Sequence, residues 1–99
     1  MPEQYRQQIE SKVRELLITK LRVSAGALEK FDSTMPMLGS GIGLDSMEAM
    51  SLAVEIEEAF GIVILDEDLN ARLFSSLDTL TDYIIKHGGK AGPMESNSL

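Results

Sequence analysis

A serine that follows a glycine-rich loop is the residue of this chain best suited to accept a chemical group. Ser46 lies in the run Gly43-Leu44-Asp45-Ser46-Met47-Glu48. Asp45 and Glu48 have the spacing of a capping box, so a helix is expected to begin here. The first turn of a helix offers free N–H groups and the positive end of the helix dipole, and both favour a phosphate. The pattern predicts Ser46, next to Asp45, as the attachment point of a phosphate-linked cofactor.

The residues that would support catalysis by the protein itself are missing from the sequence. The chain has one histidine, His87, and no cysteine, so it offers neither a zinc site nor a catalytic triad. A calcium loop beginning at Asp66 would need a glycine where Ala71 stands and a glutamate where Leu77 stands. Ser46 has no evident base to activate it. We therefore expect no catalytic residues, no metal site and a protein that is not an enzyme.

Charge and composition restrict the partners and the setting of the chain. Sixteen acidic residues against nine basic ones give a formal net charge of −7 over 99 residues. Such a chain repels nucleic acid and favours partners with basic surfaces. The absence of cysteine and of any long apolar run predicts a cytoplasmic protein that does not span a membrane. We expect it to be a monomer.

Helical periodicity and the positions of glycine predict an all-α fold. Between the first and second helices, Val23 to Leu44 shows no periodicity and is expected to form a long ordered loop with room for one short turn. The apolar run Ile62 to Leu65 is expected to be a buried connector, since one short run without a partner forms no sheet. The four expected helices are Glu3 to about Leu21, Asp45 to Phe60 with Gly61 as its stop, a short one from Asp66, and one from Ser75 to about Lys86.

The helix after Ser46 carries two apolar stripes instead of the usual one. Leu52, Ile56 and Phe60 mark the core face, and Met47, Met50 and Val54 lie nearly opposite. The second stripe either packs under the long loop or is a contact surface with an acidic rim. Its position beside Ser46 favours the contact surface, whose expected members are Met47, Glu48, Met50, Val54, Glu55, Glu57 and Glu58.

The chain is expected to contain one domain and a tail. Residues 1–87 hold all the predicted helices. Residues 88–99 are rich in glycine and small polar side chains, with too little apolar surface to offset the entropy of ordering. We expect this tail to be disordered.

Several segments together resemble the acyl carrier proteins, a phosphopantetheine-binding family. The resemblance covers about residues 5–86. The segments are Gly43-Leu44-Asp45-Ser46-Met47, then Glu57-Glu58-Ala59-Phe60-Gly61-Ile62 with Asp66-Glu67-Asp68, and finally Asp82-Tyr83-Ile84. It implies a four-helix bundle in which Ser46 bears 4′-phosphopantetheine, added from coenzyme A by a phosphopantetheinyl transferase. The thiol of this arm would carry acyl groups as thioesters.

The resemblance also implies which enzymes this chain meets. Its second helix would present apolar and acidic side chains to acyl-loading, condensing and acyl-transfer enzymes with basic docking patches. Ser51 stands where many fatty-acid-synthesis carriers have an acidic residue, and Leu65 stands where many have proline. The connection from Leu69 to Ser75 is also longer than in those carriers. These departures favour a specialised lipid, polyketide or surface-polysaccharide pathway.

Two other functions remain open at this point. A carrier of aminoacyl or peptidyl groups would use the same serine, and only the group loaded by its enzyme would distinguish it. An unmodified helical adaptor would bind basic partners through the second helix and would not need the hydroxyl of Ser46.

Overall fold

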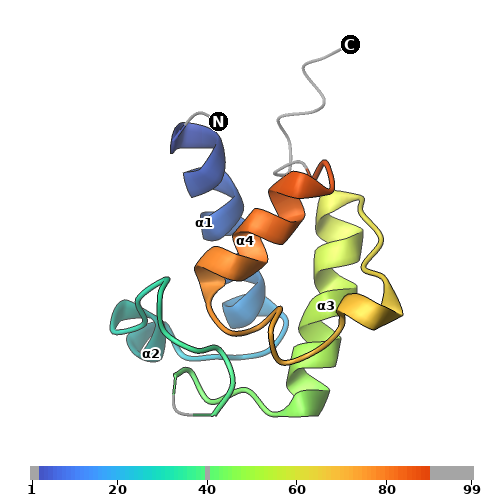
Figure 1. Ribbon diagram of the computed structural model, residues 1–99. Helices are drawn as coiled ribbons and strands as arrows, with labels where there is room; N and C mark the ends of the chain where they lie inside the picture. The colour runs from blue at the N-terminus through green and yellow to red at the C-terminus, as the bar shows by residue number, and fades with distance from the viewer. Residues whose placement is uncertain (1–2, 40, 90–99) are drawn as a thin grey trace.

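The computed structural model describes residues 3–39 and 41–89 and shows four α-helices and one 3-10 turn (Figure 1). Within these residues the only strand-like pairing is an isolated bridge between Leu38 and Leu44. The predicted all-α class is confirmed. In chain order the elements are α1 (Glu3–Thr19), α2 (Ala25–Glu29), α3 (Ser46–Phe60), the 3-10 turn η1 (Asp66–Asp68) and α4 (Leu77–Lys86).

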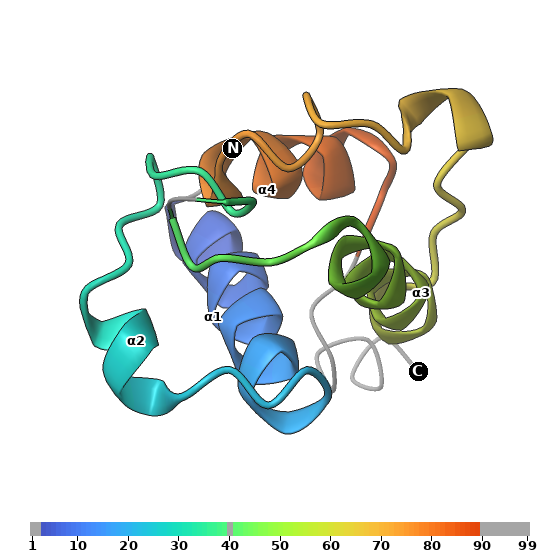
Figure 2. The ribbon, with the colours of Figure 1, turned by 90° about the horizontal axis from the view of Figure 1, so that it is seen from below.

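The core lies between the three longer helices, α1, α3 and α4, while α2 lies apart from them on the opposite side from α3 (Figures 1 and 2). Each long helix buries one apolar face, as its periodicity predicts. Removing these side chains from water is the main favourable term in holding the helices together. The completely buried apolar side chains include Ile9, Val13 and Leu17 of α1, Leu52 and Ile56 of α3, and Leu77, Leu80 and Ile84 of α4.

Helix α3 begins and ends as the sequence predicts. Asp45 is its N-cap, and Gly61 follows its last residue. Gly61 has φ 70°, a left-handed conformation that glycine adopts without steric cost, and its N–H donates to the carbonyl of Glu57 at 3.0 Å. The two ends fix α3 at 15 residues.

The long loop contains a helix, α2, that the sequence analysis did not predict beyond one short turn. The side chain of Ser24 caps it by accepting from the N–H of Ala27 at 3.1 Å. The guanidinium of Arg14, on α1, donates to the carbonyls of Leu28 and Phe31 at 3.3 and 3.1 Å. A five-residue helix is too short to form by itself, so these contacts with α1 stabilise it.

The remainder of the loop is fixed by backbone hydrogen bonds to distant segments. The N–H of Met37 donates to the carbonyl of Phe74 at 3.1 Å, and that of Leu44 donates to the carbonyl of Met37 at 3.1 Å. The side chain of Met37 is completely buried. The loop thus leads into α3 from a defined position.

Two local predictions between α3 and α4 are corrected by the structure. The helix expected from Asp66 is a single 3-10 turn, Asp66–Asp68, and no side chain caps its start. The connector Ile62 to Leu65 is extended and only half buried: Ile62 and Ile64 point into the core, whereas Val63 and Leu65 are exposed. Side chains of an extended segment alternate between its two faces, so one apolar run can serve both core and surface.

Helix α4 ends in two glycines that were assigned to the tail. Gly88 has φ 81°, and the N–H groups of Gly88 and Gly89 donate to the carbonyls of Ile85 and Ile84 at 3.1 and 2.9 Å, the pattern of a Schellman end. Gly89 is buried, and the hydroxyl of Tyr5 donates to its carbonyl. The rest of the predicted disordered tail, residues 90–99, lies outside the described residues.

Candidate functional site

Ser46 is the first residue of α3 and is exposed to solvent. The two residues of a capping box stand on either side of Ser46 in the sequence. Asp45 Oδ1 accepts from the N–H of Glu48 at 2.8 Å, and Glu48 Oε1 accepts from the N–H of Asp45 at 3.0 Å. Both carboxylates are therefore engaged with the backbone of the helix start. The N–H groups of Ser46 and Met47 have no acceptor within the helix, because the first N–H groups of any helix lack one.

This geometry suits a phosphate ester on Ser46. The hydroxyl faces solvent, free backbone donors lie at the same helix end, and the helix dipole favours a negative charge there. No lysine or arginine is needed to neutralise the phosphate. Asp45, directly before Ser46, is the N-cap of α3, as its spacing to Glu48 predicts.

Two pockets flank Ser46. One is an open hollow of about 390 Å³ on the outer face of α3, lined by Ser46, Met47, Met50, Ser51 and Val54. The other, of about 200 Å³, lies between α3 and the connection that leads to α4. Its lining comprises Leu38, Ser46, Ala49, Met50, Leu69, Asn70, Ala71 and Phe74. A group attached to Ser46 would therefore meet apolar surface on either side.

The second apolar stripe of α3 is on the surface. The side chains of Met47, Met50 and Val54 are 80%, 55% and 51% exposed. The alternative in which they pack under the long loop is wrong, because all three side chains are exposed. An ordinary surface helix buries its apolar residues, so three exposed ones beside Ser46 form an unusual patch.

The acidic residues expected around this patch differ in their availability. Glu58 is exposed, and Glu55 is partly buried. Glu57 is also partly buried, and its carboxylate accepts from the N–H of Ile64 at 2.8 Å, so it stabilises the connector after α3. Glu48 is exposed but takes part in the capping box. The sequence alone does not distinguish Glu48 and Glu57, whose carboxylates bind backbone N–H groups, from the exposed Glu58.

The sequence analysis missed the residues that the connection between η1 and α4 contributes. Leu69, Asn70, Ala71 and Phe74 form one wall of the pocket beside Ser46. The unusual length of this connection was the available signal, but length alone does not say which side chains face α3. Asn70 shapes it: its side-chain oxygen accepts from the N–H of Arg72 and of Leu73 at 2.9 and 3.3 Å.

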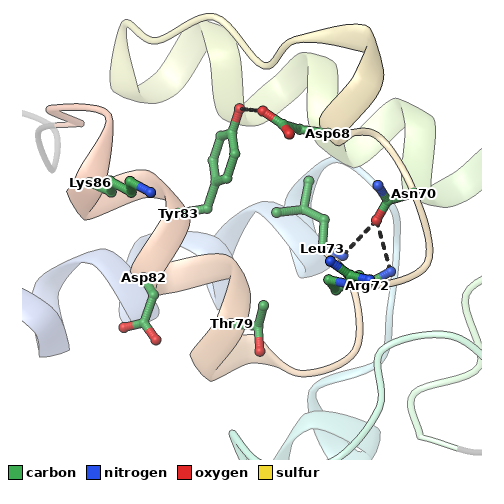
Figure 3. A pocket seen from close by; sticks show the side chains of 8 residues that line it. All are labelled: Asp68, Asn70, Arg72, Leu73, Thr79, Asp82, Tyr83 and Lys86. Atoms are coloured by element: carbon green, nitrogen blue, oxygen red, sulfur yellow. Dashed lines mark hydrogen bonds between the residues drawn. The ribbon is translucent and has the colours of Figure 1, made fainter.

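A third pocket, of about 250 Å³, lies on the α4 side of the same connection (Figure 3). The hydroxyl of Tyr83 donates to Asp68 Oδ2 at 2.8 Å across one end of it. Burial raises the pKa of Tyr83, and the hydrogen bond to Asp68 raises it further. The ring of Tyr83 also stacks on His87, with ring centroids 3.9 Å apart. The bond from Tyr83 to Asp68 joins η1 to α4, and the stacking of Tyr83 on His87 lies within the end of α4.

Within residues 3–39 and 41–89, the helices are too short or too polar to cross a lipid bilayer. The same residues contain no group of three His, Cys, Asp or Glu side chains arranged to hold a metal ion.

Comparison with known proteins gives a match to one family model and to 18 curated proteins. The family described as the phosphopantetheine attachment site matches residues 11–84. An acyl carrier protein of Chlorobium phaeobacteroides is 29% identical to this chain over 79 residues, which cover 80% of this chain and 94% of that protein. No solved structure gives a significant match to this chain. The matched region contains all of α2, α3 and η1 and most of α1 and α4.

Proposed function

Because this chain belongs to the phosphopantetheine attachment-site family as an acyl carrier protein, we propose that Ser46 bears its cofactor. This cofactor is 4′-phosphopantetheine, a flexible arm that ends in a thiol. The supporting observation is the exposed hydroxyl of Ser46 at the start of α3, next to free backbone N–H groups. Acyl carrier proteins are carriers rather than enzymes. The arm supplies the thiol chemistry, and the protein attaches and presents it.

Attachment needs a second protein. Ser46 Oγ would form a phosphoester bond with the phosphate next to pantetheine in coenzyme A. The pyrophosphate bond of coenzyme A would break, adenosine 3′,5′-bisphosphate would leave, and the proton of the hydroxyl would pass to a base. Asp45 and Glu48 are committed to the helix cap, so they are not free to act as the base for this hydroxyl. We therefore infer that a phosphopantetheinyl transferase supplies the base and that this chain is its substrate.

Partner enzymes would meet the outer face of α3. Met47, Met50 and Val54 offer apolar area beside the arm, and the exposed Glu58 lies one helical turn beyond Val54. Exposed ion pairs of this kind set orientation and encounter rate, and each contributes about 1 kcal/mol or less. Weak binding suits a carrier that must leave each enzyme. The partners would be acyl-loading, condensing and acyl-transfer enzymes with basic docking patches.

We propose that the chain acts as a cytoplasmic monomer and carries acyl thioesters in a specialised lipid, polyketide or surface-polysaccharide pathway. Ser51, Leu65 and the long connection from Leu69 to Ser75, which differ from many carriers of fatty-acid synthesis, support this choice. The pocket of about 200 Å³ beside Ser46 is large enough to shelter the first part of a carried group.

Loading with an acylated arm tests the carrier function. The chain is incubated with acetyl-coenzyme A and a broad-specificity phosphopantetheinyl transferase, and its intact mass is measured before and after neutral hydroxylamine. The proposal predicts that the acetylated arm is added and that hydroxylamine then removes only the acetyl group, as expected of a thioester. A folded, previously unmodified chain that gains no mass would instead support the unmodified adaptor.

A further inference from the structure

Two methionine side chains lie at the surface beside Ser46. Met47 and Met50 are 80% and 55% exposed, and both line the open hollow of about 390 Å³ that Ser46 also lines. Methionine is among the residues most often fully buried, because its flexible apolar side chain fills gaps in a core. These two thioethers are instead accessible to reagents in solution.

The other two methionines that the structure describes are better protected. The side chain of Met37 is completely buried. Met35 is 36% exposed, and its sulfur accepts a hydrogen bond from the N–H of Asp32 at 3.2 Å, which engages one of its lone pairs. The described methionines therefore form a series in accessibility, with Met47 the most open and Met37 the most closed.

An accessible thioether reacts with peroxides. The sulfur lone pair attacks one peroxide oxygen, the O–O bond breaks, and the other oxygen takes up a proton and leaves as water. The sulfur loses two electrons and becomes a polar sulfoxide, which methionine sulfoxide reductases convert back to methionine. The chain contains no cysteine, so no thiol of the polypeptide competes for the oxidant.

We propose that Met47 and Met50 form a reversible oxidation site, at which a peroxide controls the access of partner enzymes to Ser46. This inference rests on the proposed function, because its consequence requires enzymes that reach Ser46 over the outer face of α3. A sulfoxide oxygen buried in an apolar contact lacks a hydrogen-bond donor, so oxidation weakens such a contact. The fold would be retained, since neither side chain belongs to the core.

Site-resolved mass spectrometry of the unmodified chain tests the reactivity. After brief treatment with hydrogen peroxide, Met47 should be oxidised fastest and Met50 next, with Met37 slower than Met47 on the order of tenfold. Met1 and Met94 lie outside the described residues and are measured separately. In concentrated urea, where the chain is unfolded, the rates should converge. Equal rates for Met37 and Met47 in the folded chain would overturn the proposal.

Kinetics of the attachment reaction test the consequence. The oxidised chain is freed of peroxide, and KM for the protein is measured with coenzyme A and a broad-specificity phosphopantetheinyl transferase. The proposal predicts that oxidation raises KM about fivefold and that methionine sulfoxide reductases restore it. Circular dichroism before and after oxidation should be the same, because the core is untouched.

Two variants supply matched controls. Met47→Leu combined with Met50→Leu removes both sulfur atoms and keeps apolar side chains of similar volume. Each chain is compared with itself before and after peroxide, and KM of this double variant should not respond. Met35→Leu removes a sulfur atom outside the hollow and should leave the response of the natural chain unchanged. A response that persists in the double variant would mean that other residues cause it, contrary to the proposal.

The outcomes separate this inference from the proposed function. If the natural chain is modified and its KM stays the same after Met47 and Met50 have become sulfoxides, attachment at Ser46 stands and control by oxidation is overturned. If KM remains raised after the reductases have removed the sulfoxides, another lesion is responsible and the inference is again overturned. If the untreated chain is not modified at all, attachment at Ser46 fails and the inference falls with it.

Discussion

The carboxylate of Glu57 accepts a hydrogen bond from the backbone N–H of Ile64 at 2.8 Å, and this bond fastens the connector to the end of α3. Glu57 therefore has an internal role, although its sequence pattern is that of an acidic surface residue. The residue that follows it, Glu58, is exposed and has no such bond among those of the described residues. Of these two adjacent glutamates, Glu57 therefore stabilises the fold, whereas Glu58 lies on the surface.

Removing this bond should loosen the connector. Glu57→Ala should lower the free energy of unfolding by about 1–2 kcal/mol, because a partly buried N–H loses a charged acceptor. Glu57→Gln, which keeps an acceptor oxygen, should lose less. Urea unfolding followed by circular dichroism measures the difference, with Glu58→Ala as the control. Equal losses at Glu57 and Glu58 would mean that the hydrogen bond contributes nothing.

The sequence predicts the ends of α3 but not the hydrogen bond that Glu57 makes to Ile64. Helix α3 was predicted with its correct ends because its capping box and Gly61 are local signals. The bond of Glu57 to Ile64 and the support of α2 by Arg14 join residues that are distant in sequence, so no local pattern contains them. The same holds for Phe74, which forms part of a wall beside Ser46 only after the loop and connection pack together.

Thr81 is a buried polar residue whose removal should be tolerated. Its hydroxyl has no hydrogen-bond partner in the part of the chain that the structure describes, and its side chain is completely buried on α4. Thr81→Val should therefore raise the free energy of unfolding by about 0.5–1 kcal/mol, since it replaces an unsatisfied hydroxyl with a methyl group.

Thr79→Val provides the contrast on the same helix. The hydroxyl of Thr79 lies 3.0 Å from that of Ser76, so the substitution removes a hydrogen bond and should lower the free energy of unfolding. Calorimetry of thermal unfolding measures the change in stability of each variant. A loss of stability in Thr81→Val as large as in Thr79→Val would show that the buried hydroxyl is satisfied.

The loop before Ser46 should depend on Gly41. A Cβ atom there would overlap the backbone carbonyl of Pro36, which lies against Gly41. Gly41→Ala should lower the free energy of unfolding by about 1–3 kcal/mol, because backbone on both sides must shift. Chemical unfolding measures this loss.

Gly26→Ala is the matched control for that substitution. Gly26 lies in α2, and a Cβ atom there would have no neighbour within 4 Å. This variant should be more stable than the natural chain by about 0.5–1 kcal/mol, since alanine favours the helix and restricts the unfolded chain. If both variants lose stability equally, the close approach at Gly41 does not matter.

Glu10 should make stability depend on pH. Burial raises the pKa of Glu10 above its ordinary value of 4.5, a hydrogen bond with Asp78 raises it further, and the charges of Arg6 and Arg14 partly oppose the shift. The folded protein therefore holds this proton more tightly than the unfolded chain does. Ionised Glu10 consequently destabilises the fold at neutral pH, and this effect disappears as the pH falls below 4.5.

The expected result is that Glu10→Gln is more stable than the natural chain at pH 7 and that the difference shrinks toward zero below pH 4.5. Urea unfolding at several pH values from 4 to 8 checks this. A variant that is less stable at neutral pH would show that the carboxylate of Glu10 gains more from Arg6 and Arg14 than it loses by burial.

Intact mass after incubation with coenzyme A and a broad-specificity phosphopantetheinyl transferase tests the central claim most directly. Three chains are compared: the natural one, Ser46→Ala, and Ser51→Ala, which removes the next serine along the exposed side of α3. The account predicts one added 4′-phosphopantetheine in the natural chain and in Ser51→Ala, and none in Ser46→Ala. Addition to a folded Ser46→Ala variant, or its loss in Ser51→Ala alone, would contradict attachment at Ser46.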